Sequence, residues 1–245
     1  MVNILIADDN IYYAKVLMNI INGSNSKDMK VSYIATDGQE ALDIIKNHSV
    51  DIILLDLKMP IYDGLYILEE IEKEKMGKYK DSVIVVSGET DMICKLKESD
   101  YVHSFVNKAS SISDIIDKIN ELIKSKQEQS KEENIRMSII KELQYLNYNL
   151  SHTGTQYLID AIQLIYNKGG KKHIIYNLAE EIYPIIAKEN NLGVYNIKSN
   201  ISKANEYMYK MCKRERIQEY FGFQDKTKPT VKNVIYTVLK NISEN

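Results

Sequence analysis

Side chains suited to phosphoryl transfer fall at the ends of apolar runs in the first half of the chain. Asp8 and Asp9 close the first run, Asp56 closes the third, and Ser87 and Lys108 follow the fourth and fifth. Apolar runs of this length are typical of strands buried on both faces of a parallel sheet. A carboxylate nucleophile, further carboxylates for a metal ion, and a hydroxyl and an ammonium for phosphoryl oxygens are the groups that this chemistry requires.

The three carboxylates predict a cation site. If the two strand ends are neighbours, the charges of Asp8, Asp9 and Asp56 repel one another, and at least one pKa rises. A hard divalent cation such as Mg²⁺ relieves this repulsion, because it prefers oxygen ligands and keeps several waters. The alternative for Asp56 alone is a strand-end aspartate that caps the next helix.

The elements that must position these groups alternate between strand and helix. Amphipathic helices separate the apolar runs, which predicts a doubly wound parallel sheet with right-handed crossovers. In such sheets ligands bind outside the carboxyl ends of the strands, where the polar side chains lie. The expected strands are Asn3–Ala7, Lys30–Ala35, Ile52–Asp56, Ser82–Val86 and Val102–Val106.

Residues 1–124 resemble the receiver domain of two-component response regulators. The resemblance rests on the pair Asp8-Asp9, the segment Asp56-x-x-Met59-Pro60-x-x-Asp63-Gly64, Ser87 and Lys108, in the order and near the spacing of that family. It implies a flavodoxin-like fold that accepts a phosphoryl group from a histidine kinase or a phosphotransfer protein.

The same resemblance implies a role for each matching residue. Asp56 is the phosphoryl acceptor. Asp9 and Asp56 bind Mg²⁺ together with the backbone carbonyl of Lys58, and Asp8 acts mainly through water. Ser87 and Lys108 hold the phosphoryl oxygens, and Ser87 and Phe105 are the switch residues. The chain has Ala109 where the family usually has proline, often after a cis bond, so the conformation of the Lys108–Ala109 peptide stays open.

The two halves of the chain differ in charge. The formal net charge is −2, but residues 1–124 carry −7 and residues 135–245 carry +6. The basic half suggests a nucleic acid or another acidic partner, although ordinary surface variation is an alternative. Residues 125–134 lack large apolar side chains, which predicts an interdomain linker or a solvated continuation of the preceding helix.

Residues 135–245 show helical periodicity and little strand patterning, which predicts an all-α domain. A short helix, an asparagine (Asn191) at a position that favours φ > 0, and a longer helix are typical of a helix-turn-helix. A plain helical hairpin is the alternative. The apolar stripe expected on the longer helix is Val194, Ile197, Ile201, Ala204, Met208 and Met211.

Residues from about 150 to 242 resemble the DNA-binding domain of the sporulation-initiation master regulators, the stage-zero sporulation protein A family. The matching segments are Thr153-Gly154-x-x-Tyr157-Leu158-x-x-Ala161-Ile162, Ile182-Tyr183-Pro184-x-Ile186-Ala187-Lys188, Tyr220-Phe221-Gly222-Phe223 and Lys228-Pro229-Thr230. By this resemblance, Pro184–Glu189 is the supporting helix and Val194–Cys212 the recognition helix, which places a helix-turn-helix DNA-binding domain at residues 135–245.

The recognition helix departs from that family because its outward positions carry no arginine. The expected DNA contacts are Asn196, Lys198, Ser199, Ser202 and Lys203, beside an outward Tyr195. Asparagine and serine can contact base edges, and lysine can contact guanine or phosphate, but the bidentate grip of arginine on guanine is missing.

These features together predict a cytosolic, phosphorylation-controlled transcription regulator, active in sporulation or a related stationary-phase programme, that forms a homodimer on phosphorylation and binds double-stranded DNA. The alternative is a phosphorylation-controlled interaction protein that modulates a related regulator without reading DNA. An independent enzyme is disfavoured, since no further catalytic constellation is evident.

No apolar stretch approaches the roughly 20 residues of a membrane span, and the first residues are expected to form a strand rather than a leader. Cys94 and Cys212 are expected to be reduced, buried thiols.

Overall fold

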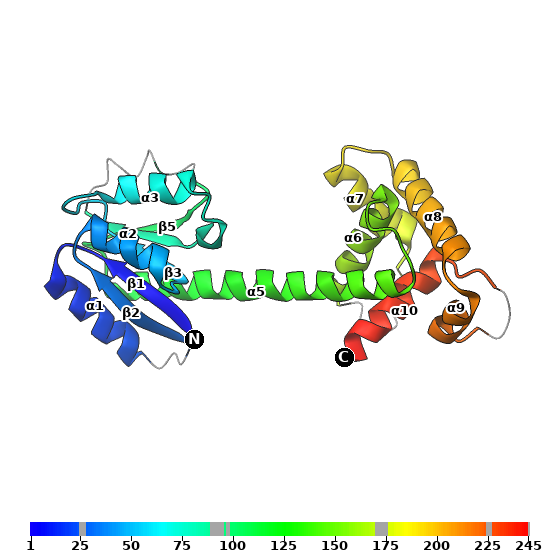
Figure 1. The fold of residues 1–245 in the computed structure, drawn as a ribbon, viewed down its shortest axis with the longest axis horizontal. Helices are drawn as coiled ribbons and strands as arrows, with labels where there is room; N and C mark the ends of the chain where they lie inside the picture. Colours follow the sequence, from blue (N-terminus) through cyan, green and yellow to red (C-terminus); the bar gives the residue numbers. More distant parts are fainter. Residues whose placement is uncertain (25–27, 89–95, 97–98, 170–175, 224–226, 245) are drawn as a thin grey trace. The chain divides into compact units, whose positions relative to one another are not determined.

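The computed structural model describes residues 1–24, 28–88, 96, 99–169, 176–223 and 227–244. The chain divides into two compact units, Met1–Glu128 and Gln129–Asn245. Figure 1 shows the helices and strands of each unit.

The first unit is built on a parallel sheet of five strands. The strands are β1 (Val2–Ala7), β2 (Met29–Ala35), β3 (Ile52–Leu55), β4 (Val83–Ser87) and β5 (Val102–Asn107). Their order in the sheet is β2-β1-β3-β4-β5, and every neighbouring pair is parallel. The predicted flavodoxin-like, doubly wound fold is therefore confirmed, with each strand boundary within one residue of its expected position.

Alternating side chains of the strands build a core on each face of the sheet. Leu5 and Ala7 of β1 pack on the side that carries α2 (Gly38–Asn47) and α3 (Gly64–Lys73). Ile4 and Ile6 pack on the side that carries α1 (Ile11–Gly23) and α5 (Ile112–Tyr145). This two-residue alternation is the ordinary geometry of a strand, and it buries both faces of the central strands. A short 3₁₀ helix, η1 (Gly77–Tyr79), precedes β4.

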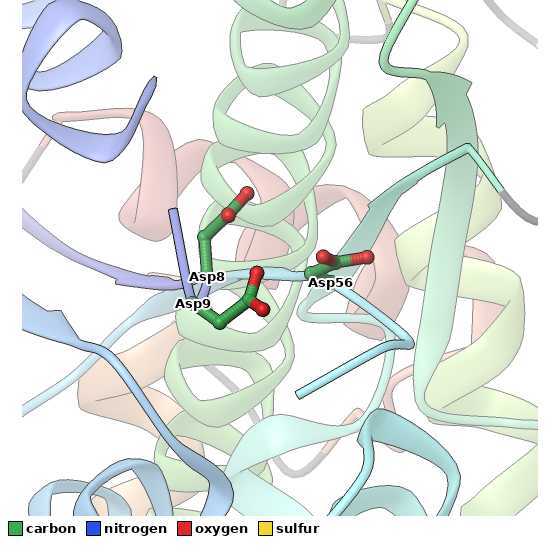
Figure 2. A group of neighbouring side chains, drawn as sticks. All are labelled: Asp8, Asp9 and Asp56. Atoms are coloured by element: carbon green, nitrogen blue, oxygen red, sulfur yellow. The ribbon is translucent and has the colours of Figure 1, made fainter. Parts of the chain in front are cut away.

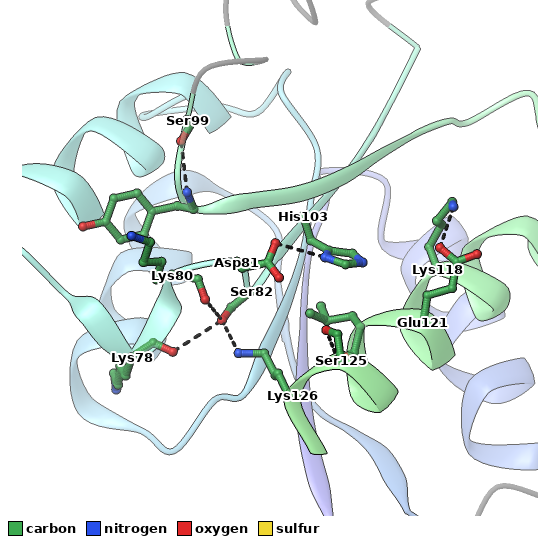
Figure 3. Close-up of polar contacts among 12 residues, drawn as sticks. Lys78, Lys80, Asp81, Ser82, Ser99, His103, Lys118, Glu121, Ser125 and Lys126 are labelled. Carbon is green, nitrogen blue, oxygen red and sulfur yellow. Dashed lines mark hydrogen bonds and ion pairs between the residues drawn. The ribbon is translucent and has the colours of Figure 1, made fainter. Parts of the chain in front are cut away.

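The segment predicted as a linker, residues 125–134, lies within α5. Lys126 extends from α5 to the start of β4, where its ammonium donates to Ser82 Oγ at 2.6 Å (Figure 3). Ser82 Oγ in turn donates to the carbonyl oxygen of Lys80 at 3.0 Å. Burial lowers the pKa of Lys126, against the opposing effect of the Asp81 and Asp51 charges. The helical alternative for this segment is the one observed, and its first turn is fastened to the sheet.

Every regular element of the second unit, within the residues described, is a helix. The C-terminal part of α5 is followed by α6 (Thr153–Asn167), the π-helical turn η2 (Leu178–Ile182), α7 (Tyr183–Glu189), α8 (Val194–Met211), α9 (Arg214–Phe221) and α10 (Val231–Glu244). Pro184 stands in the first turn of α7, where a missing N–H is harmless. Pro184 is therefore compatible with the start of α7 directly after η2.

Close packing and a buried polar network hold α8 in this unit. A Cβ on Gly154 of α6 would lie 2.0 Å from the carbonyl oxygen of Asn200, so only glycine permits the observed approach of α6 to α8. Asn205 of α8 is buried, accepts a hydrogen bond from Tyr148 Oη at 2.7 Å and donates one to Pro229 O at 2.9 Å. Burial raises the pKa of Tyr148, which keeps its hydroxyl a donor.

Two side chains that were expected to be buried, Met211 and Cys212, differ in exposure. Met211 was expected in the apolar stripe of the recognition helix, but it is 54% exposed at the last position of α8, and Asn205 occupies the buried face instead. The predicted apolar stripe was wrong at Met211, because helical spacing does not specify where the helix stops contacting the core. Cys212 is a buried free thiol, as expected, whereas Cys94 lies outside the described residues.

The contact at Gly154 generates a stability prediction. Gly154→Ala places a methyl group against backbone atoms of α8, so α6 and α8 must separate, and we expect the free energy of unfolding to fall by about 1–3 kcal/mol. Thermal unfolding of the full chain, followed by circular dichroism, measures the loss. Gly77→Ala is the control, because a Cβ there meets nothing within 4 Å. Equal midpoints for the two variants would contradict the prediction.

Candidate phosphorylation site and nucleic-acid interface

Three carboxylates converge at the carboxyl ends of β1 and β3 (Figure 2). Oxygen atoms of Asp8, Asp9 and Asp56 all lie within 4.8 Å of one another. Asp8 is 2% and Asp56 is 5% exposed, whereas Asp9 is exposed to solvent. The parallel pairing of β1 with β3 brings these side chains together, and the bond from Asp56 N to Ala7 O, 2.9 Å, extends that pairing to the site.

Lys108 connects the two buried carboxylates. Its ammonium lies 2.8 Å from Asp8 Oδ2 and 2.6 Å from Asp56 Oδ2. Burial alone would lower the pKa of Lys108, but hydrogen bonds to Asp56 and Asp8 and the charges of both carboxylates raise it. Burial also raises the pKa of Asp8, with Lys108 opposing that shift. The lysine is therefore held protonated between two groups that would otherwise repel each other.

Backbone groups fix the remaining oxygens of the buried pair. Asp8 Oδ1 accepts from the Asn10 amide at 2.9 Å, and Asp56 Oδ1 accepts from the Lys58 amide at 3.3 Å. Each buried carboxylate thus has one oxygen toward a backbone N–H and one toward Lys108. Hydrogen bonds of this kind favour the charged form of a carboxylate.

The loop after β3 approaches the site so closely that it requires glycine. A Cβ on Gly64 would lie 2.4 Å from the carbonyl oxygen of Asp56 and 2.8 Å from the Cα of Leu57. Gly64 also donates its N–H to Leu57 O at 3.0 Å. Asp63 caps α3 by accepting from Tyr66 N at 2.8 Å. The Asp63-Gly64 pair thus turns the chain from the Asp56 loop directly into a helix.

Ser87 and Phe105 occupy the strands beside the carboxylates. Ser87 ends β4 and is 1% exposed, and its carbonyl accepts from the Lys108 amide at 3.2 Å. Phe105 lies in β5, is half-buried, and packs on the core face that carries α2 and α3. Within the described residues no peptide bond is cis, so Lys108 and Ala109 are joined by a trans bond.

Sequence reasoning missed Tyr13. The Lys108 ammonium lies 5.3 Å from the centroid of its ring. Burial and the nearby Asp8 charge raise the pKa of Tyr13. The available signal was its place one turn after Asn10, whose side chain caps α1 by accepting from Tyr13 N at 3.1 Å.

The donor set fits a hard divalent cation. Three carboxylate groups with mutually close oxygens offer only oxygen ligands, which Mg²⁺ prefers, and the exposed Asp9 leaves a side open to the waters that Mg²⁺ retains. The formal charge of three carboxylates exceeds the single charge of Lys108. The residues present therefore suit an added cation.

A helix-turn-helix geometry lies in the second unit. Helix α7 ends at Glu189, Asn191 adopts φ 53°, and α8 begins at Val194. The Leu192 amide donates to Ala187 O at 2.9 Å, which closes the end of α7. Asparagine tolerates this left-handed conformation better than most residues. The turn predicted from the sequence is confirmed at the expected residue.

The outer face of α8 carries most of the expected contact residues. Asn196, Lys198, Ser202 and Lys203 are exposed, and Ser199 is half-buried. Tyr195 is 80% exposed at the start of the helix. The chain therefore presents amide, hydroxyl and ammonium groups there, and no guanidinium.

Two surface grooves border this face. One is lined by Lys203, Asn200 and Tyr207 of α8 and by residues 151–154 at the start of α6. The other is lined by Lys198 of α8, Lys232 of α10 and residues around η2. Lys198 and Asn200 are about 200° apart around an α-helix, so the grooves lie on opposite flanks of α8.

Comparison with known families separates the same two parts of the chain. Residues 4–120 match the response regulator receiver domain, and residues 138–242 match the sporulation initiation factor Spo0A C-terminal domain. The chain therefore carries a receiver domain followed by a Spo0A C-terminal domain. The combination of these two domains makes it a phosphorylation-regulated transcription regulator.

Similar solved structures each cover about half of the chain. They include the Francisella response regulator 1452 receiver domain, with 26% identity, a TM-score of 0.45, and coverage of 51% of this chain and 99% of that chain. The REC domain of AraT from Geobacillus stearothermophilus has 28% identity, a TM-score of 0.43 and coverage of 54% and 99%. TrrA from Thermotoga maritima, in complex with Mg²⁺-BeF, has 24% identity, a TM-score of 0.42 and coverage of 50% and 99%. No helix in the part of the chain that the structure describes combines the length and apolar character needed to span a membrane.

The Lys108 bridge generates a prediction about stability. In metal-free buffer, Lys108→Ala leaves two buried carboxylates without their cation, and we expect the free energy of unfolding to fall by about 3 kcal/mol. Thermal unfolding in the presence of a chelator measures the loss. Lys118→Ala is the matched control, because it removes only an exposed ion pair with Glu121. A loss no greater than that of the control would argue against the bridge.

Proposed function

We propose that Asp56 accepts a phosphoryl group from a histidine kinase or a phosphotransfer protein. The observation that supports this most strongly is the position of Asp56 at the end of β3, nearly buried, beside two further carboxylates and in contact with Lys108. Asp9 and Asp56 would hold Mg²⁺ together with the backbone carbonyl of Lys58, and Asp8 would act mainly through water. Bound Mg²⁺ would neutralise charge on the phosphoryl oxygens during transfer.

In the proposed step an oxygen of Asp56 attacks the phosphorus atom, the bond to the donor breaks, and its electron pair leaves with the donor group. Lys108 then exchanges Asp56 Oδ2, 2.6 Å away, for a phosphoryl oxygen. Because the pKa of Lys108 is raised, its ammonium stays protonated and neither gains nor loses a proton during the transfer. The Ser87 hydroxyl donates a hydrogen bond to a second phosphoryl oxygen. Ser87 and Phe105 carry the resulting change along β4 and β5.

An exposed apolar stripe on α1 suits the phosphodonor protein. Tyr12, Val16 and Ile20 are 81%, 50% and 41% exposed and recur every four residues, so they share one face. α1 begins at Ile11, and only its cap, Asn10, separates it from the Asp8-Asp9 pair. A partner helix packed on this stripe would lie beside the acceptor carboxylate.

For the second unit we propose binding to double-stranded DNA through α8, with Asn196, Ser199 and Ser202 toward the bases and Lys198 and Lys203 toward phosphates. The grooves on the two flanks of α8 support this arrangement. Phosphorylation would free or dimerise this unit, and we propose that the active form is a homodimer.

We assign residues 1–124 to the receiver domain, 125–134 to the linker and 135–245 to the effector domain. We propose that the protein acts in the cytoplasm, in sporulation or a related stationary-phase programme.

One observation favours a second function. The outer face of α8 has no arginine, and Tyr195 on it is 80% exposed. Such a face also suits a protein partner. In that case the phosphorylated chain modulates a related regulator and does not read DNA itself.

The phosphorylation proposal is tested with a small acyl phosphate and Mg²⁺. Intact mass spectrometry should find one added phosphoryl group on the wild-type chain and none on Asp56→Asn. Asp63→Asn is the matched control, since asparagine can still cap α3 and the residue lies outside the carboxylate cluster. Labelling of Asp56→Asn at the wild-type level would show that the acceptor is another residue.

The DNA proposal is tested by selection from random duplexes, followed by binding measurements at several salt concentrations. Lys203→Gln should weaken binding to all duplexes and reduce the log–log salt slope by roughly one unit, because it removes one phosphate contact. Ser199→Ala should instead relax preference at one or two positions and cost about 1–3 kcal/mol on the best site.

Lys141→Gln, an exposed lysine on α5, is the control for charge alone. We expect the selected site to differ from that of arginine-bearing relatives. Recovery of the relatives' own site would contradict altered specificity. No binding at low salt would instead support the interaction protein.

A further inference from the structure

The groove on the Lys198 flank of α8 is built from three separate segments. Its lining comprises the approach to η2 and α7, the first turns of α8, and the first turn of α10. The described residues that line it include two lysines and no carboxylate: Tyr176, Asn177, Leu178, Ala179, Tyr183, Lys198 and Lys232. The described lining side chains therefore carry two positive charges, and they include the nearly buried Tyr176 and Tyr183.

Hydrogen bonds hold the three walls together. Tyr236 of α10 accepts from the Tyr176 amide at 3.0 Å, which fastens the approach to η2 onto α10. Asn205 of α8 donates to Pro229 O at 2.9 Å, which fastens α8 to the residues just before α10. The spacing of the walls that carry Lys198 and Lys232 is thus set by interior contacts rather than by the lysine side chains.

The first turn of α10 is also fixed locally. Thr230 and Asn233 cap it reciprocally, with Asn233 N donating to Thr230 Oγ1 at 3.1 Å and Thr230 N donating to Asn233 Oδ1 at 2.9 Å. Lys232 lies inside this capped turn and is exposed, with its ammonium 6.0 Å from the Tyr236 ring centroid. Its backbone is ordered while its charge stays available to a ligand.

The place of the groove indicates which anion it receives. A recognition helix in the major groove of DNA has the phosphates of one strand along each flank. Lys203 lies in the groove on one flank of α8, and the Lys198–Lys232 groove lies on the other.

We propose that Lys232, outside the helix-turn-helix, binds the DNA backbone together with Lys198, so that this groove receives a phosphate of one strand. This inference rests on the proposed DNA binding and adds a contact that the motif alone does not contain. An acidic protein segment in the same groove is the competing occupant.

The test uses the full chain and a random-sequence duplex, with affinity measured across a range of salt concentrations before and after treatment with Mg²⁺ and a small acyl phosphate. Lys232→Gln should weaken binding about fivefold to tenfold near 0.1 M salt and flatten the log–log slope by roughly one unit. Lys232→Arg should retain both. Lys240→Gln, an exposed lysine two turns further along α10, is the matched control and should change neither.

The outcomes separate the two proposals. If the wild type binds and Lys232→Gln behaves like Lys240→Gln, the groove is not a backbone site, although DNA binding stands. If the wild type binds no duplex at low salt, both proposals fail, and the groove is then available to an acidic protein. The Lys198→Gln/Lys232→Gln double variant should lose less affinity than the product of the single losses, because both lysines serve one phosphate. Fully multiplicative losses would assign them to separate sites.

Discussion

Repulsion among carboxylates that the fold forces together is the constraint on which the first unit depends. Parallel pairing of β1 with β3 leaves no other place for Asp8 and Asp56 than the same sheet edge, nearly out of water. Lys108, carried in by β5, meets both charges, and the amides of Asn10 and Lys58 complete the bonding of the buried oxygens. The buried charges of the pocket are therefore paired and hydrogen-bonded. A cation or a phosphoryl group enters a site whose ligand and donor groups are already in place.

The second unit depends on a different constraint, which is how closely its helices approach. Gly154 lets α6 meet the backbone of α8, and Asn205 connects α8 to Tyr148 and Pro229. These contacts act on the inner side of α8. They determine the orientation of the helix without using any of the residues proposed to contact DNA.

Much of this architecture could be predicted from the sequence, because its signals were local. Apolar runs that end in Asp8 and Asp56 specified strands and their carboxylate ends, and Asn191 specified a left-handed turn. Long-range packing left weaker signals. Nothing local to Asn205 marks it as buried, since its partners are 57 and 24 residues away. Tyr13 and Lys232 were missed for the same reason: their importance depends on a neighbour brought in by the fold.

The separation of duties on α8 has a consequence for how this protein can evolve. Its inner positions, among them Ile197, Ile201 and Asn205, secure the helix, whereas Asn196 and Ser202 are exposed. Substitutions at such exposed positions usually change stability little. Substitutions can therefore change the outer face of α8 while the fold of the unit is kept. Arginines can be lost from this face and new targets acquired through a series of variants that all fold.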